Sequence, residues 1–528
     1  MTILPSSEGA SMGGDHHSSE EADLSMFAAV LSSMHLERLP DFASEIRSRN
    51  RHPQDKILPG KNGCSVVSPP LYGSYHILFT IKFNDGEKWL LKVPATGHAT
   101  RHDRICASSL MSEAMTMRLL RDKTTILIPE VYSFDSSLSN ALNCPYILME
   151  YIVAIPLHEL WFDNQCPKDL LEARRARALE EIAVAMVQMG ALTYGEGGSL
   201  VFAEGERDPT IGPMRRMDMQ AMLDRLKTDD SDETAIYCEV EPSKDPKAYF
   251  QSLADWSRSP ADDYGKGLHH LLRHFIDWMP CSTHYVEPDF VLSHPDFDIQ
   301  NVLVTPEGNL RALIDWDGVA TVPRCVGNER YPAWLTRDWD PAKYFYNPEQ
   351  GEDIRENSPE ELENYRAMYR GFIGKAIIAT RADKWTGDKE FNAFATITQN
   401  SLVIGSLEIA ITDPVSMPDI LRKVFNQLKC HVPSQPLSDK EEGDEAKSKE
   451  ESIKKTDDEG GDESSDEDDF FLYDIAIALA AGELDDCRLA IIKSGFQAFG
   501  SETLNNQFQH HICHGSRAQE LVEEVLLR

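Results

Sequence analysis

The sequence predicts an α+β protein of two lobes, with a small strand-rich lobe before a larger and mainly helical one. Between residues 71 and 152, short runs of β-branched, aromatic and other apolar residues alternate with turn signals, as strands do. Beyond Leu170, apolar residues recur instead at the 3.6-residue spacing of amphipathic helices. The chain has 528 residues, 41% of them hydrophobic, which is enough for about two to four compact units.

The chain is strongly acidic. Its formal net charge at pH 7 is −35, which argues against nucleic-acid binding and against docking on anionic membranes. The ten cysteines are scattered without CxxC spacing, which favours free thiols in a reducing compartment. The first 25 residues show neither a secretory h-region nor an Arg-rich amphipathic pattern. We therefore expect a cytoplasmic protein, with a nuclear location left open, that binds neither nucleic acid nor membrane.

Composition divides the chain into five segments. Residues 1–22 are polar and predicted to be disordered, and residues 23–150 are predicted to form the first lobe with a leading helix. Residues 151–437 are expected to form the second lobe. Residues 438–469 carry sixteen acidic residues against five lysines and almost no apolar ones, so we expect a disordered insertion. Apolar patterning returns in residues 470–528, which predicts helices that pack on the second lobe.

Local sequence patterns predict individual strands and one helix of the first lobe. Residues 77–83 and 89–93 are predicted to form strands, and the Asn-Asp-Gly run at 84–86 predicts the hairpin turn that joins them. Residues 104–121 carry apolar positions at helical spacing. Two further strand-like runs follow, and the second of them covers residues 146–152. We therefore expect a small sheet with one crossing helix.

Two patterns near the C-terminus have more than one interpretation. Ser464 and Ser465 precede four acidic residues, a context that acidophilic kinases accept, although a solvated linker is the simpler explanation. The histidine-rich run at 510–514 resembles a metal cluster, but it lacks a second matched ligand pair. Surface histidines at a helix end are the favoured interpretation of that run.

The most informative stretch lies between Ser293 and Asp317, where a short loop is expected to lead into a β-hairpin. Asn301 and Asp315 would lie side by side on this hairpin, and both carry the oxygen ligands that Mg²⁺ prefers. Asp296 is then left to accept a proton from an attacking hydroxyl. Kinase-type phosphoryl transfer uses one such base and two such metal ligands. A polar turn in an ordinary hairpin is the simpler alternative for these three residues.

The pattern H-x-D-x(4)-N followed by I-D-W resembles the aminoglycoside phosphotransferase/choline kinase-like family, the small-molecule branch of the protein-kinase-like fold. The similarity extends over about residues 71–317 and includes a resemblance to the fungal phosphotransferase-enzyme-family members. Its other segments are the Gly73-Ser74-Tyr75-His76 turn, the Leu91-Lys92-Val93-Pro94 strand end, residues 145–151, and the Gly198-Ser199-Leu200 and Ile211-Gly212-Pro213 runs.

The resemblance implies a role for each matching residue. Asp296 would be the catalytic base, and Asn301 and Asp315 would hold the metal. Lys92 would pair with the α/β-phosphates of ATP and be anchored by Glu113, for which Asp103 and Glu130 are alternatives. The remaining implied residues cover the phosphates with a turn or read adenine through the backbone: Gly73, Ser74, Met149, Glu150, Tyr151 and Ile152. Asp298 and Asp317 would assist in the metal shell or merely cap turns.

Several departures from kinase patterns limit the function expected. The phosphate turn has one glycine where protein kinases have G-x-G-x-x-G, and Pro295 follows His294 in place of the common glycine. Asp-Trp-Asp at 315–317 replaces Asp-Phe-Gly, which counts against a protein kinase. We expect ATP- and Mg²⁺-dependent transfer of the γ-phosphoryl group to a hydroxyl of a small, cationic acceptor. A catalytically inactive kinase-like binding protein is the alternative, and a protein kinase comes third.

Overall fold

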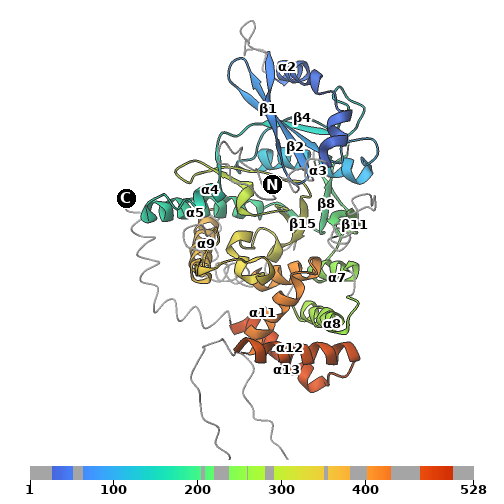
Figure 1. Ribbon diagram of the computed structural model, residues 1–528, viewed down its shortest axis with the longest axis vertical. Helices are drawn as coiled ribbons and strands as arrows, with labels where there is room; N and C mark the ends of the chain where they lie inside the picture. Colours follow the sequence, from blue (N-terminus) through green and yellow to red (C-terminus); the bar gives the residue numbers. More distant parts are fainter. Residues whose placement is uncertain are drawn as a thin grey trace, which may run out of the picture.

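A five-stranded antiparallel sheet forms the first lobe, in the spatial order β1-β2-β3-β5-β4. The strands are β1 (Cys64–Tyr72), β2 (His76–Phe83), β3 (Lys88–Pro94), β4 (Val131–Asp135) and β5 (Tyr146–Glu150). In the computed structural model this lobe lies above the larger second lobe (Figure 1).

The structure describes nine stretches of the chain. They are residues 26–50, 63–203, 208–218, 237–257, 260–279, 290–349, 355–380, 401–429 and 464–502. Within these stretches, the helices are all too short or too polar to cross a bilayer.

Different helices cover the two faces of the first sheet. Residues 26–33, which are helical, and α2 (Leu39–Asn50) cover one face with a core that includes Phe79 and Leu91. Helix α3 (Arg104–Lys123) packs on the other face against residues such as Ile147. Because neighbouring strand residues point to opposite faces, Lys92 is directed towards α3 while Leu91 faces α2. The side chain of Lys92 therefore lies on the face of the sheet that packs against helix α3.

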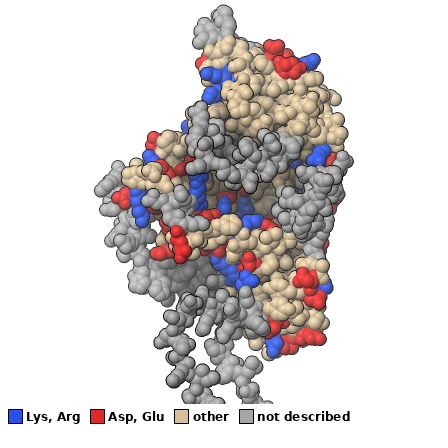
Figure 2. Space-filling view, viewed as in Figure 1, with Lys and Arg blue, Asp and Glu red and all other residues tan. Residues whose placement is uncertain are grey.

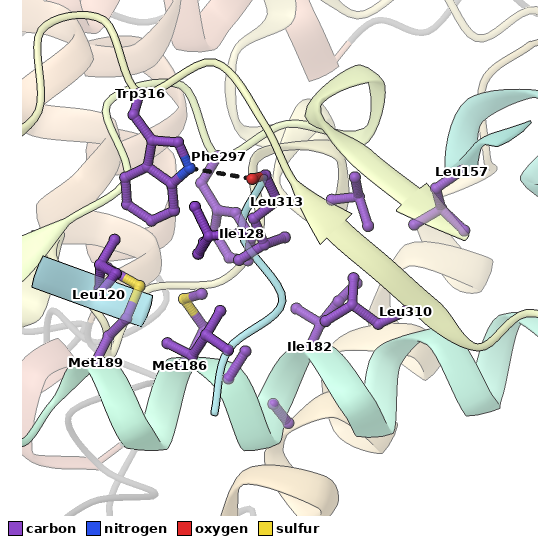
Figure 3. Packing of buried hydrophobic residues seen from close by; sticks show 14 of the residues in the cluster. Leu120, Ile128, Leu157, Ile182, Met186, Met189, Phe297, Leu310, Leu313 and Trp316 are labelled. Carbon is purple, nitrogen blue, oxygen red and sulfur yellow. Dashed lines mark hydrogen bonds between the residues drawn. The ribbon is translucent and has the colours of Figure 1, made fainter. Parts of the chain in front are cut away.

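The core of the second lobe next to the site lies on α5 (Lys168–Met189). α4 (Leu157–Trp161) and α9 (Pro359–Thr380) pack on α5, and the hairpin β13 (Val302–Val304) and β14 (Leu310–Leu313) covers it. Figure 3 shows Ile182, Met186 and Met189 of α5 pointing towards Leu310, Leu313 and Trp316. β6 (Ile155–Pro156) adds a third strand beside β13. Apolar packing on α5 thus fixes the position of the β13–β14 hairpin.

A second helical group lies farther from the site, at the bottom of Figure 1. It contains α7 (Pro246–Trp256), α8 (Asp263–Trp278), α11 (Met417–Lys429), α12 (Ser464–Ala481) and α13 (Asp486–Glu502). These helices share one apolar core, and α12 approaches α8 so closely that a side chain at Gly267 would meet the backbone of Ala476.

The two-lobed α+β fold predicted from the sequence is confirmed, and so are the hairpin of β2 and β3 and helix α3. The second lobe differs from the mainly helical prediction because it also contains a five-stranded sheet. The order of its strands is β7 (Thr193–Tyr194), β12 (Phe290–Ser293), β15 (Ala320–Pro323), β8 (Gly198–Val201) and β9 (Thr210–Gly212). Strands of two to four residues carry too little periodicity to stand out in the sequence.

Two predicted boundaries also need correction. Strand β5 ends at Glu150, before the end of the predicted run at 146–152. Helix α12 begins at Ser464, inside the tract at 438–469 that was predicted to be disordered. A serine followed by acidic residues suits a helix start, because these residues favour the positive end of the helix dipole. The rest of that tract, residues 1–22 and the histidine-rich run at 510–514 lie outside the described residues.

Candidate active site

Lys92 of β3 lies at the centre of a buried cluster of charges. Its Nζ donates hydrogen bonds to Glu113 Oε1 of α3 at 2.7 Å and to Asp315 Oδ1 at 2.8 Å. The side chain of Lys92 is 3% exposed, and that of Glu113 is 4% exposed. Of the three partners considered for Lys92, the structure places Glu113 beside it, whereas Asp103 caps the N-terminus of α3. One lysine therefore joins the sheet, the crossing helix and the hairpin of the second lobe.

The charges in this cluster shift one another's pKa. Burial raises the pKa of Glu113 to about 7, although attraction to Lys92 opposes the change. Burial alone would lower the pKa of Lys92, but Asp315 and Glu113 outweigh it and raise that pKa above its usual value. Burial works against the ionised form of Asp315, and the Lys92 ammonium overcomes this and lowers the pKa of Asp315. Asp315 is thus the carboxylate that Lys92 keeps ionised most firmly.

Asp296 and Asn301 are connected directly in the loop before β13. Asn301 Nδ2 donates to the Asp296 backbone oxygen and to Asp296 Oδ2, both at 2.9 Å, and Gln300 Nε2 reaches the same Oδ2 at 3.3 Å. Asp296 is exposed, whereas Asn301 is 1% exposed. Within the described residues, Asp296 Oδ1 accepts no hydrogen bond, so this oxygen is the one that can face an acceptor hydroxyl.

The hairpin brings the backbone segments that carry Asn301 and Asp315 together. The backbone N–H of Ile314 donates to the carbonyl of Asn301 at 3.0 Å. Asp315 has φ +64, an unusual conformation for a residue other than glycine. The next residue, Trp316, is fully buried and donates from Nε1 to the Leu313 carbonyl at 3.0 Å (Figure 3). The buried tryptophan anchors the turn that holds Asp315 in this conformation.

His294 holds the loop before β13 in place through two hydrogen bonds to the backbone. Its Nε2 lies 2.8 Å from the Ile314 carbonyl, and its Nδ1 accepts the Asp296 backbone N–H at 3.3 Å, so the proton belongs on Nε2. His294 is 2% exposed, and burial lowers its pKa to about 4. The neutral imidazole therefore links the two chain segments that carry Asp296 and Asp315.

Acidification should weaken the fold through His294. Its folded-state pKa is lowered to about 4, so between pH 6.5 and 4 the unfolded chain binds the proton first and stability falls as the pH falls. From pH 7 to pH 5 this group should cost about 2 kcal/mol. His294→Asn should remove that part of the pH dependence in urea unfolding at both pH values. If the variant loses as much stability as wild type between pH 7 and 5, this role of His294 is wrong.

The predicted phosphate turn and hinge are less constrained. The Gly73 N–H donates to the His76 carbonyl at 2.8 Å, closing the turn between β1 and β2, and Ser74 is exposed. Met149 is buried within the sheet. The Glu150 N–H is already bonded to the Glu130 carbonyl at 2.8 Å. Backbone groups for adenine would therefore come chiefly from Tyr151 and Ile152, which follow the end of β5.

Asp317 lies in an ion pair that the sequence did not indicate. Arg215 of β10 (Met214–Met217) donates to Asp317 Oδ2 at 2.8 Å, and Ser109 Oγ of α3 donates to Asp317 Oδ1 at 3.0 Å. His76 Nε2 lies 3.8 Å from the same carboxylate, and burial lowers the pKa of His76 to about 4. Arg215 lies more than 100 residues before Asp317 in the chain, so no local pattern could connect the two. Asp298 instead caps the turn at residues 299–301 and bonds Arg337 at 2.8 Å.

The donor set suits a hard divalent cation. Asn301, just before β13, and Asp315, just after β14, supply an amide and a carboxylate, and Mg²⁺ commonly binds one or two such groups together with substrate phosphates and water. Among the described residues no three His, Cys, Asp or Glu side chains form a ready metal cage. Figure 2 shows charged side chains of both signs in the hollow between the lobes.

The two lobes, the lysine that joins sheet, helix and hairpin, and the loop before β13 together form the two-lobed α+β arrangement that the sequence predicts. No protein-family model matches the chain. A subtelomeric hrmA-associated cluster protein of Aspergillus fumigatus is 20% identical over 359 residues, which are 58% of this chain and 68% of that protein. The mitochondrial protein named altered inheritance of mitochondria protein 9, from Kluyveromyces lactis, is 22% identical over 305 residues. That match covers 48% of each protein, so this chain spans about half the length of that relative.

The solved structures that the chain resembles include small-molecule phosphotransferases and kinases. Macrolide 2′-phosphotransferase MphH from Brachybacterium faecium is 11% identical, with 73% of this chain and 97% of its own covered at a TM-score of 0.31. Plasmodium vivax ethanolamine kinase is 11% identical, with 74% and 95% covered at a TM-score of 0.30.

The expected cytoplasmic location is contradicted by the curated relatives. Those from Kluyveromyces lactis, Yarrowia lipolytica, Candida tropicalis and Zygosaccharomyces rouxii are all named as mitochondrial proteins. The expectation rested on the scattered cysteines and on the composition of the first 25 residues, which lie outside the described residues. Composition alone was too weak a signal for a location.

Proposed function

We propose that this protein is an ATP- and Mg²⁺-dependent phosphotransferase that acts on a hydroxyl of a small molecule. The observation that carries the proposal is Lys92, which bonds Glu113 at 2.7 Å and Asp315 at 2.8 Å. This places an ammonium between the crossing helix and the candidate metal ligand, next to the loop of Asp296. The arrangement matches the needs of phosphoryl transfer, which depends on positioning and on neutralising phosphate charge.

Each residue then has a separate task. Lys92 would bind the α/β-phosphates, while Glu113 holds its ammonium in place. Asn301 and Asp315 would hold Mg²⁺, which when bound neutralises the phosphate charge. Asp296 Oδ1 would accept the proton of the acceptor hydroxyl as the oxygen of that hydroxyl bonds to the γ-phosphorus. The bond from the γ-phosphorus to the bridging oxygen breaks at the same time, and ADP leaves with the electron pair.

The acceptor is expected to be small and cationic. The chain carries a formal net charge of −35, and a cleft lined by one sign of charge raises the local concentration of ligands of the opposite sign. The proposed base, Asp296, is itself an exposed carboxylate, which would attract a cationic acceptor. Screening should therefore begin with amino alcohols and aminated sugars before neutral polyols.

A thermal shift with ATP, with and without Mg²⁺, tests the proposal. Wild type should be stabilised by ATP with Mg²⁺, by about 2.7 kcal/mol at a hundred times the Kd. Asp315→Ala should lose the Mg²⁺-dependent part of the shift. Glu307→Ala is the matched control, because Glu307 is an exposed acidic residue in the turn of the same hairpin, and its shift should equal that of wild type.

Two results would count against an enzyme. No stabilisation of wild type by ATP in either condition would contradict the nucleotide site. Stabilisation without turnover of any acceptor, including protein acceptors, would favour the alternative of a kinase-like binding protein. Transfer to protein acceptors or autophosphorylation would instead favour a protein kinase, which Asp-Trp-Asp at 315–317 makes the weaker candidate.

A further inference from the structure

A two-stranded hairpin from the second lobe reaches the site. It consists of β10 and β11 (Tyr237–Val240), which pair antiparallel with Arg215 opposite Glu239 and Met217 opposite Tyr237. Side chains alternate between the two faces of such a hairpin. Arg215, Met217, Tyr237 and Glu239 therefore share one face, and the residues between them share the other.

The second face is fixed to the body of the second lobe. Met214 and Val240 are 4% and 8% exposed, and Met214 belongs to the apolar core formed by α7 and α8. Arg216 donates to the hydroxyl of Tyr249 and lies 3.5 Å from the carboxylate of Glu408. The hairpin is consequently anchored on the second lobe by packing and by the half-buried guanidinium of Arg216.

The first face contacts three parts of the candidate site. Arg215 bonds Asp317 at 2.8 Å, directly after the Asp315–Trp316 pair. Glu239 forms an ion pair with Arg104 at the start of α3. Met217 Sδ accepts a weak hydrogen bond from Tyr75 in the phosphate turn at 3.9 Å. One face of the β10–β11 hairpin therefore contacts α3, the segment after β14 that carries Asp315 and Asp317, and the turn between β1 and β2.

Arg215 is the most enclosed of these links. Its side chain is 17% exposed, its guanidinium carbon lies 4.4 Å from the ring centroid of Tyr237, and Asp317 is 20% exposed. Asp317 also accepts from Ser109 of α3 at 3.0 Å, so the guanidinium, the carboxylate and the helix form one chain of contacts. His76, which also approaches Asp317, is held neutral at pH 7 by burial.

Charge balance shows why this contact matters for the reaction. Glu113, Asp315 and Asp317 are three carboxylates that act on the same buried ammonium of Lys92. Without a second cation, Asp317 would compete with the other two for Lys92, because a buried carboxylate is costly when unpaired. Arg215 supplies that cation from the second lobe.

We propose that Arg215 is a positioning residue for phosphoryl transfer, which holds Asp317 away from Lys92 and, through Ser109, fixes helix α3 to the second lobe. Lys92, Glu113 and Asp315 then stay assembled before nucleotide binds. This inference rests on the proposed function. It implies that the β10–β11 hairpin fixes the position of helix α3, which carries Glu113.

Steady-state release of ADP from ATP, with the acceptor found by screening or with water alone, tests the role of Arg215. Arg215→Gln should lower kcat about 100-fold, as a displacement of about 1 Å at a reacting centre can do, while the Kd for ATP changes by less than about threefold. Arg215→Lys should recover most of kcat, because an ammonium can still pair with Asp317. A loss of structure alone would not be repaired by restoring one charge.

A second substitution identifies the route of the effect. In Arg215→Gln with Asp317→Asn, no carboxylate is left to compete for Lys92, so kcat should exceed that of Arg215→Gln alone. The matched control is Arg216→Gln on the opposite face of the same strand, which should lower Tm and leave kcat of the folded enzyme unchanged. Thermal unfolding of all variants separates stability from turnover.

The outcomes separate this inference from the proposed function. If wild type neither binds ATP with Mg²⁺ nor releases ADP, the proposed function fails and this inference fails with it. If wild type is active and Arg215→Gln keeps its kcat, the positioning role alone is overturned. The same holds if Arg215→Gln is slow but neither Arg215→Lys nor the Asp317→Asn double variant recovers any rate.

Discussion

Asp296→Asn is expected to reduce phosphoryl transfer by about 10³-fold, since an amide cannot take the proton of the attacking hydroxyl. The substitution preserves the shape of the side chain, and Asp296 is exposed, so the fold should be unaffected. Nucleotide binding should also persist, because Lys92 and Asp315 are untouched. The measurement is the transfer rate at saturating ATP, together with the ATP-dependent thermal shift.

Asp298→Asn is the matched control for this prediction. Asp298 lies two residues farther along the same loop, but its carboxylate caps the turn at 299–301 and pairs with Arg337 at 2.8 Å. This variant should lose some stability and less than about tenfold in rate, in the range of a lost partly buried ion pair. If Asp296→Asn keeps a rate similar to that of Asp298→Asn, Asp296 is not the base.

The loop and hairpin of the site could be foreseen because their geometry is local. Asp296 and Asn301 lie five residues apart, and a turn containing Gly308, which has φ +91, brings Asp315 back beside Asn301. The lysine could be foreseen because an apolar strand on both sides of Lys92 predicts a buried partner. Choosing Glu113 over Asp103 or Glu130 needed a family pattern, since spacing alone allowed all three.

Arg215 could not have been found in this way. It reaches Asp317 only because β10 alternates its side chains between the body of the second lobe and the site. Its neighbour Arg216 has the same chemistry and the opposite direction, so composition does not distinguish them. The short strands of the second sheet were missed for a related reason, because β12 pairs with β7 across 96 residues (Phe290 with Tyr194) and β15 with β8 across 121 (Ala320 with Ser199), and such pairing leaves no local periodicity.

Lys92→Met should have the other large effect, on both activity and stability. Transfer should fall by at least about 100-fold, because the phosphates lose their cation. Removing one partner of a buried pair costs about 3–5 kcal/mol, since Glu113 is left as an unpaired buried carboxylate. Urea unfolding and the transfer rate measure the two effects separately.

The stability loss of Lys92→Met should grow with pH, and the sign follows from Glu113. Its folded-state pKa is already raised to about 7 by burial, and loss of Lys92 raises it further above the unfolded value of 4.5. The stability that a raised carboxyl pKa supplies is complete below pH 4.5 and is lost as the pH rises through the folded-state pKa. Lys92→Met should therefore differ least from wild type near pH 5 and most near pH 8.

Adding Glu113→Gln to Lys92→Met provides the decisive comparison. The double variant has no buried carboxylate at position 113 to ionise, so it should regain most of the lost stability at pH 8 and little at pH 5. Transfer should stay low in both variants, because the ammonium is absent from each. Equal stability of the single and double variants at pH 8 would show that Glu113 is not paired with Lys92 in the folded protein. Recovered transfer in the double variant would instead remove Lys92 from the proposed phosphate site.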